Sequence, residues 1–414
     1  MIKRVIFFIE APYSKRDHKR WGIDILKNNG FEIEIWDCTP VYHPDLNLTI
    51  ADPFEFPGLK KFQKRKNIIS SILKLSKDDL VITWFQYQLR FFWFYRALSK
   101  SKVSYAVLFV TTIPNVIGQG VEKNKVRLKI NNFLKRVWSL LVSKNIVDFN
   151  WHIRYFANRI FIAIPYKIFG IKCPVLWFAG GKDSLKYFVV PSCKTTQIVW
   201  LHAQDYDRYL DLKNSLTRRE ETTASPKAVF LDMYLPFHED FAMSKQLPYV
   251  TADNYYASIR RFLDFVEKEL GIEVEIAAHP RSHYTENCDY YGARNIRKGH
   301  TDEMVRDAKF VITHDSAALN LAVIYKKPVI FTFTDEMAKS EVIFLIYEMS
   351  SWLNKQPINI DQPLSINWDE ALKVEDIYYE NYKKAFIKKP NTPELHSWQI
   401  AADVIKNFRS TAKP

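Results

Sequence analysis

Short apolar runs alternate with helical patterns along most of this chain of 414 residues, and this alternation limits the fold more than any other feature. The first unit is an apolar run at Val5–Ile9, a helical pattern at Trp21–Asn28, the helix-stopping Gly30 and a second run at Glu32–Trp36. Strand, helix and strand in this order open a parallel α/β domain. Two further strands are predicted at Leu80–Trp84 and Tyr105–Val110.

The alternation pauses near Val190–Thr195 and then restarts, which predicts a second domain. Its predicted elements are Gln197–His202, Ala228–Leu231, Tyr255–Leu270, Glu273–Ala278, Thr301–Ala308, Phe310–Thr313, Ser316–Tyr325 and Pro328–Phe333. A chain of this length also exceeds the ~100–200 residues of one ordinary domain. We therefore expect two Rossmann-like α/β domains, at residues 1–190 and 191–375, followed by a helical segment at residues 376–414.

The chain is basic, with 59 Lys and Arg against 46 Asp and Glu and a formal net charge of +13. Such a surface attracts acidic partners: a nucleotide, an anionic sugar, nucleic acid or an anionic membrane. Much of the excess lies in residues 123–172, where Val126–Val142 has apolar residues at helical spacing. A solvated amphipathic helix and a helix docked on an anionic membrane surface both fit this pattern.

Several protein classes lose support from what the sequence lacks. The four cysteines are widely spaced and have no metal-ligand pattern, so they fit reduced cytosolic thiols. The sequence has no Gly-x-Gly-x-x-Gly after the first strand, no P-loop, no Gly-x-Ser-x-Gly and no zinc signature. The apolar stretch Ile160–Gly181 is broken by Pro165, Lys167, Lys172 and Pro174, which argues against a membrane span. We expect a cytoplasmic protein, with peripheral membrane contact left open.

The predicted site lies where the second-domain strands end, because ligands of open α/β sheets bind beyond the carboxyl ends of the strands. Pro280 stops the run Glu273–Ala278 and leaves His279 and Arg281 at its end. An imidazole and a guanidinium this close can reach one anion together, and the guanidinium fork suits phosphate or carboxylate. A histidine with ordinary partners at a strand end is the alternative.

Ser316 and Ala317 follow the next predicted strand and open an apolar helical pattern. Free backbone N–H groups and the helix dipole at such a start can bind a phosphate, whereas a plain N-cap is the alternative. A similar choice holds for Lys298, Gly299 and Thr301, a short turn that either presents backbone to a base edge or only caps a helix.

Asp232 directly ends the strand Ala228–Leu231, which is an unusual place for a carboxylate. An aspartate there can act as a base or a nucleophile, or simply serve in a turn. In the first domain, Gly180, Gly181 and Lys182 either bring backbone close to an acidic ligand or form a surface turn.

Two motifs carry a resemblance to a known family. Ala278-His279-Pro280-Arg281 with Ser316 resembles the His-Pro and Ser pattern of two-domain GT-B glycosyltransferases that use CMP-activated acidic sugars. Together with Phe230-Leu-Asp232-Met-Tyr-Leu-Pro236-Phe-His238, it most resembles the retaining β-Kdo glycosyltransferases of bacterial O-antigen and lipopolysaccharide biosynthesis. The resemblance covers the second domain, and it reaches the first only through general architecture.

The resemblance implies an α/β, GT-B-like fold with a cleft between the domains and a C-terminal helix that packs back on the N-terminal domain. It implies that Asp232 attacks the anomeric carbon of Kdo, that CMP leaves, and that an acceptor hydroxyl then displaces Asp232 with net retention. His238 or Asp240 is the implied acceptor base. The implied nucleotide and phosphate contacts are His279, Arg281, Lys298, Gly299, Thr301, Ser316 and Ala317, and the implied sugar contacts are Gly180, Gly181, Lys182 and Tyr234.

The implied partners are CMP-Kdo and a lipid-linked O-antigen glycan, whose chain the enzyme would cap. No metal or cofactor is expected, because cationic side chains and a helix terminus can stabilise a monophosphate leaving group. The implied location is the cytoplasm, with residues 123–172 as the segment for any peripheral contact with the inner membrane. The alternatives are an inverting CMP-sialic acid or other nonulosonate transferase and, from other classes, a basic nucleic-acid-binding protein or a peripheral scaffold without catalysis.

Overall fold

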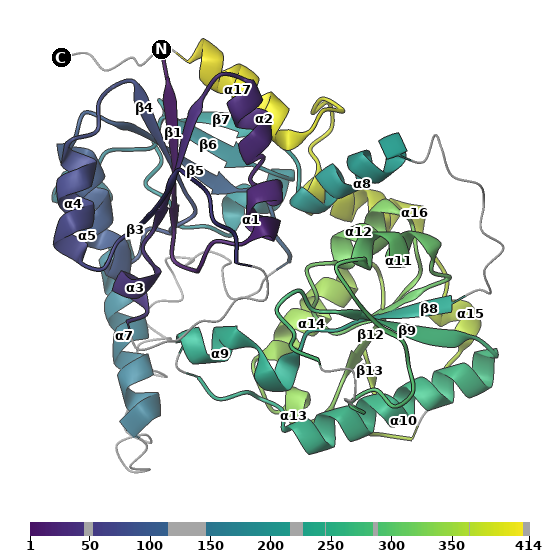
Figure 1. Cartoon of the computed structure of the whole chain (residues 1–414). Helices are drawn as coiled ribbons and strands as arrows, with labels where there is room; N and C mark the ends of the chain where they lie inside the picture. Colours follow the sequence, from purple (N-terminus) through teal and green to yellow (C-terminus); the bar gives the residue numbers. More distant parts are fainter. Residues whose placement is uncertain are drawn as a thin grey trace.

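The computed structural model describes residues 1–44, 53–114, 146–215, 227–244, 246–284, 289–363 and 365–408. These residues form two α/β domains, each built on a parallel sheet (Figure 1). The predicted amphipathic helix Val126–Val142 lies outside the described residues, as does the whole of 123–145 in the basic segment 123–172.

The first sheet has the strand order β3-β2-β1-β4-β5-β6-β7, and all of its pairings are parallel. Its strands are β1 (Arg4–Ile9), β2 (Glu32–Asp37), β3 (Leu59–Lys61), β4 (Asp79–Thr83), β5 (Ser104–Phe109), β6 (Leu176–Ala179) and β7 (Gln197–Trp200). Side chains of β1 alternate between two cores, with Phe7 on one face of the sheet and Phe8 on the other. Both faces are therefore covered, as parallel sheets require.

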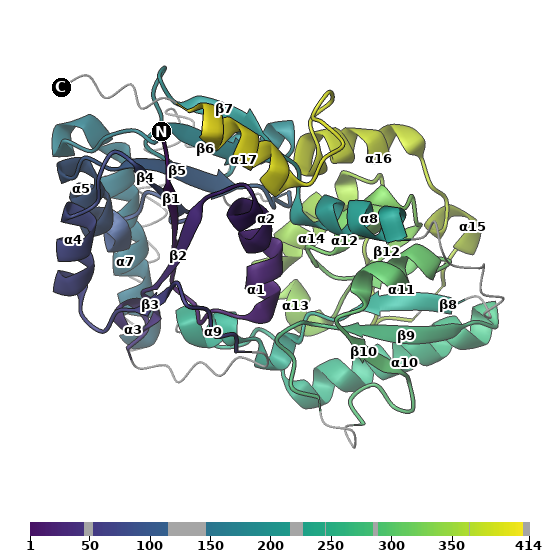
Figure 2. The ribbon, with the colours of Figure 1, turned by 45° about the horizontal axis from the view of Figure 1, so that its top comes forward.

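The first sheet is accompanied by the helices and 3₁₀ turns α1 (Lys15–Arg20), α2 (Ile23–Asn28), α3 (Thr39–Tyr42), α4 (Arg65–Leu73), η1 (Leu89–Phe91), α5 (Phe92–Lys100), α7 (Ile146–Ala163), η3 (Tyr166–Phe169) and η4 (Lys182–Lys186). The C-terminal helix α17 (Ser397–Asn407) also packs here, beside α2 (Figure 2). Gly22 permits this packing, because a Cβ at Gly22 would overlap the Trp398 side chain and because its φ of +54° disfavours other residues.

The second sheet has the order β10-β9-β8-β11-β12-β13, again with parallel pairings throughout. Its strands are β8 (Lys227–Leu231), β9 (Glu273–Ala278), β10 (Ile296–Lys298), β11 (Val311–Thr313), β12 (Val329–Phe333) and β13 (Ile358–Asn359). The helices and turns of this half are α8 (Gln204–Ser215), η6 (Leu235–Phe237), α9 (Glu239–Ser244), α10 (Ala252–Leu270), α11 (Thr301–Asp307), α12 (Leu319–Ile324), α13 (Asp335–Ala338), α14 (Val342–Ser351), α15 (Trp368–Ala371), α16 (Asp376–Tyr382) and the π-turn η7 (Lys383–Ile387). Strand β8 lies between β9 and β11, so the ends of these three strands are neighbours.

Two of the predicted boundaries differ from the structure. The run at Gln197–His202, which we assigned to a second domain beginning at residue 191, supplies β7 and pairs in parallel with β6 at the edge of the first sheet. The segment 376–414 was assigned to cross back as a whole, but Tyr379, Tyr382 and Phe386 belong to the core of the second domain. The part of this segment that enters the first-domain core is α17, through Trp398, while η7 touches only the loop after β6.

Within the described ranges, the structure contains no helix that is both long enough and apolar enough to cross a bilayer.

Candidate active site at the strand ends of the second domain

Asp232 follows β8 directly, and its carboxylate is buried among hydrogen-bond donors. Oδ1 accepts from the backbone N–H of Tyr234 at 2.7 Å and from the hydroxyl of Tyr291 at 2.7 Å. Oδ2 accepts from the backbone N–H of His279 at 3.1 Å and from the hydroxyl of Tyr284 at 2.9 Å. Burial raises the pKa of Asp232, while these hydrogen bonds favour its charged form. The carboxylate is thus held in one position by four donors.

The backbone turn after Asp232 is strained. Tyr234 adopts a φ of +52°, a left-handed conformation that is uncommon for a residue with a bulky side chain. The hydrogen bond from its N–H to Asp232 stabilises the turn that leads into η6. The Tyr234 ring is buried and stacks edge to face on Tyr284 at 5.2 Å between centroids. Its predicted contact with a sugar therefore requires this aromatic cluster to open.

His238 and His279 meet beside Asp232, with their Nε2 atoms 3.4 Å apart. The backbone N–H of Arg281 points at Nδ1 of His279, and that of Asp240 points at Nδ1 of His238, both at 3.2 Å. Each Nδ1 is therefore an acceptor, which leaves the proton of the neutral ring on Nε2. Two N–H donors cannot satisfy each other, so this pair is suited to donate jointly to one anion.

The surroundings keep these rings neutral. Desolvation lowers the pKa of His279 to about 3, and the nearby charges of His238, Arg16, Arg281 and Lys298 act in the same direction. Burial also lowers the pKa of His238. The Arg281 guanidinium is held at the same place by Asp240, with 3.0 Å between Nη1 and Oδ1.

Ser316 lies beyond the end of β11, but the helix that we predicted to begin there starts at Leu319. Ser316 and Ala317 form the turn that leads into it, and the Ser316 hydroxyl accepts from the N–H of Ala318 at 3.3 Å. Neighbouring Asp315 is buried, its Oδ1 has no hydrogen-bond partner among the described residues, and burial raises its pKa to about 6.

The predicted turn at Lys298, Gly299 and Thr301 is present, with one difference. Lys298 donates from Nζ to the carbonyl of Ser282 at 2.7 Å, which ties it to the loop that carries His279. Gly299 has a φ of +86°. Thr301 is the first residue of α11, so the N-cap position belongs to His300 and not to Thr301. The side chain of His300 makes no cap hydrogen bond.

Gly180 and Gly181 lie in the first domain and are explained by close backbone packing. A Cβ at Gly180 would overlap the carbonyl of Val110, and one at Gly181 would overlap the carbonyl of Ala385 in η7. Gly181 therefore allows the loop after β6 to rest on the second domain, and Lys182 beside it is exposed. Nothing in this geometry requires a sugar, so that role stays a prediction.

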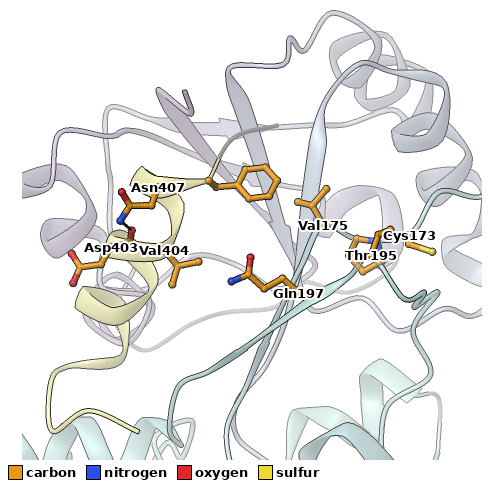
Figure 3. Close-up of a pocket in the computed structure, with 9 residues that line it drawn as sticks. Cys173, Val175, Thr195, Gln197, Asp403, Val404 and Asn407 are labelled. Carbon is orange, nitrogen blue, oxygen red and sulfur yellow. Dashed lines mark hydrogen bonds between the residues drawn. The ribbon is translucent and has the colours of Figure 1, made fainter. Parts of the chain in front are cut away.

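A cavity beside the first sheet lies away from this site. It has a volume of about 540 Å³ and lies between α17 and the amino ends of β6 and β7, where Val175, Gln197 and Val404 line it (Figure 3). The candidate site lies at the carboxyl ends of the second-domain strands, so the cavity does not belong to it.

The structure brings together Asp232, His238, Asp240, His279 and Arg281 through continuous contacts, with Lys298 joined through Ser282. Among the described residues, no group of three or more His, Cys, Asp or Glu side chains has an arrangement that would hold a metal. Sequence reasoning missed Arg16, whose charge acts on His279 from the first domain. The signal was present in the run Lys15-Arg16-Asp17-His18-Lys19-Arg20.

The architecture is similar to that of solved structures. CalG4, the calicheamicin glycosyltransferase, aligns over 100% of both chains with 12% identity and a TM-score of 0.51. The fold is GT-B. More distant likenesses include the wall teichoic acid polymerase TagF (12% identity, 98% of this chain and 89% of that one, TM-score 0.47) and the S. aureus MnaA–UDP complex (11%, 100% and 99%, 0.45). No protein-family model and no curated protein matches the sequence.

The GT-B architecture confirms the predicted fold class, with two parallel α/β domains and their helices. At this level of identity the likeness extends to the fold alone, since one fold supports many activities.

Proposed function

We propose that this protein is a glycosyltransferase that moves an acidic sugar from its CMP conjugate to a glycan acceptor. The observation that carries the proposal is the pair of histidines His238 and His279, whose Nε2 atoms meet 3.4 Å apart while both Nδ1 atoms accept from backbone N–H groups, in a loop that the buried carboxylate Asp232 anchors through the backbone N–H of His279. A phosphate oxygen beside the two Nε2 atoms would accept from both rings. Arg281 and the turn at Ser316 would complete the phosphate site, with Ala317, Lys298, Gly299 and Thr301 close to the nucleotide.

Asp232 is proposed as the nucleophile of a retaining, double-displacement reaction. A carboxylate oxygen attacks the anomeric carbon, and CMP leaves with the electron pair of the broken C–O bond. An acceptor hydroxyl then attacks the same carbon, gives its proton to Asp240, and releases the Asp232 carboxylate. His238, the other candidate base, has both ring nitrogens engaged in the tautomer described above. The hydrogen bond from Tyr284 to Oδ2 would have to loosen for the attack, which makes Tyr284 a gate on the nucleophile.

The specific donor that we propose is CMP-β-Kdo, and the acceptor is a lipid-linked O-antigen glycan that the transfer would terminate. This rests on the resemblance of the motifs around Asp232 and His279. We propose further that the reaction uses no metal, that Gly180, Gly181, Lys182 and Tyr234 contact the sugar, and that the protein works in the cytoplasm, with residues 123–172 contacting anionic lipid at the inner membrane.

An inverting transferase for sialic acid or another nonulosonate is the second candidate. The four hydrogen bonds to Asp232 favour it, because a carboxylate whose lone pairs are occupied is a poor nucleophile. In that reaction Asp232 would order the loop of His279 and would not bond to the sugar.

A donor screen tests the proposal. CMP-Kdo, CMP-N-acetylneuraminic acid and UDP-glucose are each supplied with a glycan acceptor, and nucleotide release and product are followed by mass spectrometry. We expect turnover with CMP-Kdo. Turnover with CMP-N-acetylneuraminic acid alone would select the second candidate, and turnover with UDP-glucose alone would reject both.

The anomeric configuration of the product separates the mechanisms. NMR of the product should show the β-configuration of the donor. The α-anomer would exclude the double displacement and with it the role of Asp232 as nucleophile.

A further inference from the structure

Helix α8 connects the candidate site with the first domain. Near its start, Oδ2 of Asp205 accepts from Nδ2 of Asn320 in α12 at 3.0 Å. Further along the same helix, Oδ2 of Asp211 lies 3.4 Å from Nζ of Lys19 in α1. Arg208 is three residues from each aspartate, and residues at this spacing share one helix face. Arg208 therefore faces the region between α12 and α1.

Helix α1 brings further cations to the same region. Arg16 lies three residues before Lys19 and four before Arg20, so the three side chains share one side of the helix. Lys19 contacts α8, and Figures 1 and 2 both show α1 on the side of the first domain that faces the second. Arg16 and Arg208 thus approach each other from different domains.

Few acidic side chains are paired with the arginines between α1 and α8. Arg20 lies beside Asp17 at 3.3 Å, and Arg281 is paired with Asp240. Neither Arg16 nor Arg208 has a hydrogen bond or an ion pair with any residue that the structure describes.

The lowered pKa of Arg16 is consistent with a guanidinium that lacks a counter-ion. Arg16 stays accessible to solvent, yet lost hydration between the domains and then the charges of Arg20 and Arg208 lower its pKa to about 10. Asp205 is a nearby carboxylate, but burial raises its pKa, which weakens it as a counter-ion. Charges of one sign gathered in this way favour an anion between them.

We propose that Arg16 and Arg208 form a second anion subsite, which binds the carboxylate of the donor sugar. This rests on the proposed function, because it is 2-keto acid sugars that carry a carboxylate on the anomeric carbon, next to the phosphate. His238, His279 and Arg281 hold the phosphate, and the two remaining guanidinium groups supply the planar forks that carboxylates bind. Since one fork comes from each domain, an acidic donor would also hold the domains together.

The test measures binding of CMP and of CMP-Kdo, without acceptor, to the full chain and to its Arg16→Ala and Arg208→Ala variants. Isothermal titration gives the affinities, and thermal unfolding checks that each variant is folded. Lys15→Ala is the matched control, because it removes one charge from an exposed position of the same helix, directly before Arg16. We expect each arginine variant to lose about 10- to 100-fold in affinity for CMP-Kdo, the effect of one hydrogen-bonded charge. Affinity for CMP should stay within about twofold, and Lys15→Ala should match the wild type for both ligands.

Two results would overturn the subsite. Equal losses for CMP and CMP-Kdo would assign the arginines to the phosphate. Unchanged affinity for CMP-Kdo in both arginine variants would leave Arg16 and Arg208 without a role in donor binding. A wild-type protein that binds neither ligand would instead reject the proposed function itself, and the subsite with it.

Discussion

At the scale of single residues, the site depends on how the backbone sets side-chain chemistry. His238 and His279 both present Nε2–H because backbone amides occupy their Nδ1 atoms. Asp232 is fixed in the same way by the N–H groups of Tyr234 and His279. Neither feature is visible in the sequence, where each residue reads as an isolated polar group at a strand end.

Asp232→Asn should lower the free energy of unfolding, because the amide puts an NH₂ group where two donors now find an oxygen. Each donor left unsatisfied costs about 1–3 kcal/mol. Denaturant unfolding measures the loss, and Asp240→Asn is the control, since that side chain is exposed and its change should stay within about 0.5 kcal/mol. Equal stability of the two variants would mean that the four hydrogen bonds to Asp232 do not hold in solution.

His314 gives a pH-dependent term in stability. Its ring is buried between the Tyr255 hydroxyl and the Thr332 carbonyl, and burial lowers its pKa to about 4. The unfolded chain takes up this proton near pH 6.5, before the folded protein does, so the stabilisation is complete above pH 6.5 and is lost as the pH falls toward 4. Relative to His314→Gln, the wild type should lose about 1.4 kcal/mol per pH unit in this range. If the free energies of unfolding of the wild type and of His314→Gln changed in parallel with pH, this role of His314 would be contradicted.

At the scale of elements, the domains are joined by close contacts of short segments. The loop after β6 rests on η7 through Gly181, and α17 returns to the first domain through Trp398. A helical segment was predicted for residues 376–414, and α17 (Ser397–Asn407) is the part of it that enters the first-domain core. The packing of α17 on α2 depends on Gly22, because any side chain at this position would overlap Trp398.

Gly181→Ala should weaken the contact between the domains, because the new methyl group would overlap the Ala385 carbonyl. Overpacking of this kind costs about 1–3 kcal/mol. Thermal unfolding should show the loss, whereas Lys182→Ala, at the exposed neighbouring position, should leave the midpoint unchanged. A Gly181→Ala protein with the wild-type midpoint would show that the loop after β6 and η7 separate freely in solution.

At the scale of the whole molecule, the sequence predicts eight buried strands and the edge strand β7, and it misses four short strands, among them the buried β6. Apolar runs identify β1, β2, β4, β5, β8, β9, β11 and β12, because strands buried on both faces are continuously apolar. The strands β3 and β10 escape detection because each is three residues long and partly exposed, with two lysines in Leu59–Lys61. The domain boundary was placed too early because a loop near Pro191 resembles a linker, while the pairing of β7 with β6 depends on contacts that no local pattern reports.

The candidate site shows the same limit. His279, Arg281 and Asp232 are predictable because strand ends in parallel sheets bind ligands. The contribution of Arg16 is not, since it depends on how the two domains face each other. For Gly180 and Gly181, the sequence does not separate the close backbone packing that the structure shows from contact with a ligand, which stays a prediction.

The central claim is that His238 and His279 hold the phosphate of a cytidine nucleotide, and calorimetric titration with CMP tests it most directly. The wild type should bind CMP, and His238→Ala and His279→Ala should each bind it about tenfold more weakly or worse, as expected when one hydrogen bond to a charged group is lost. His283→Ala, in the same loop but exposed, should bind CMP like the wild type. CMP binding that survives both histidine variants unchanged, or a wild type that binds no CMP, would contradict the account.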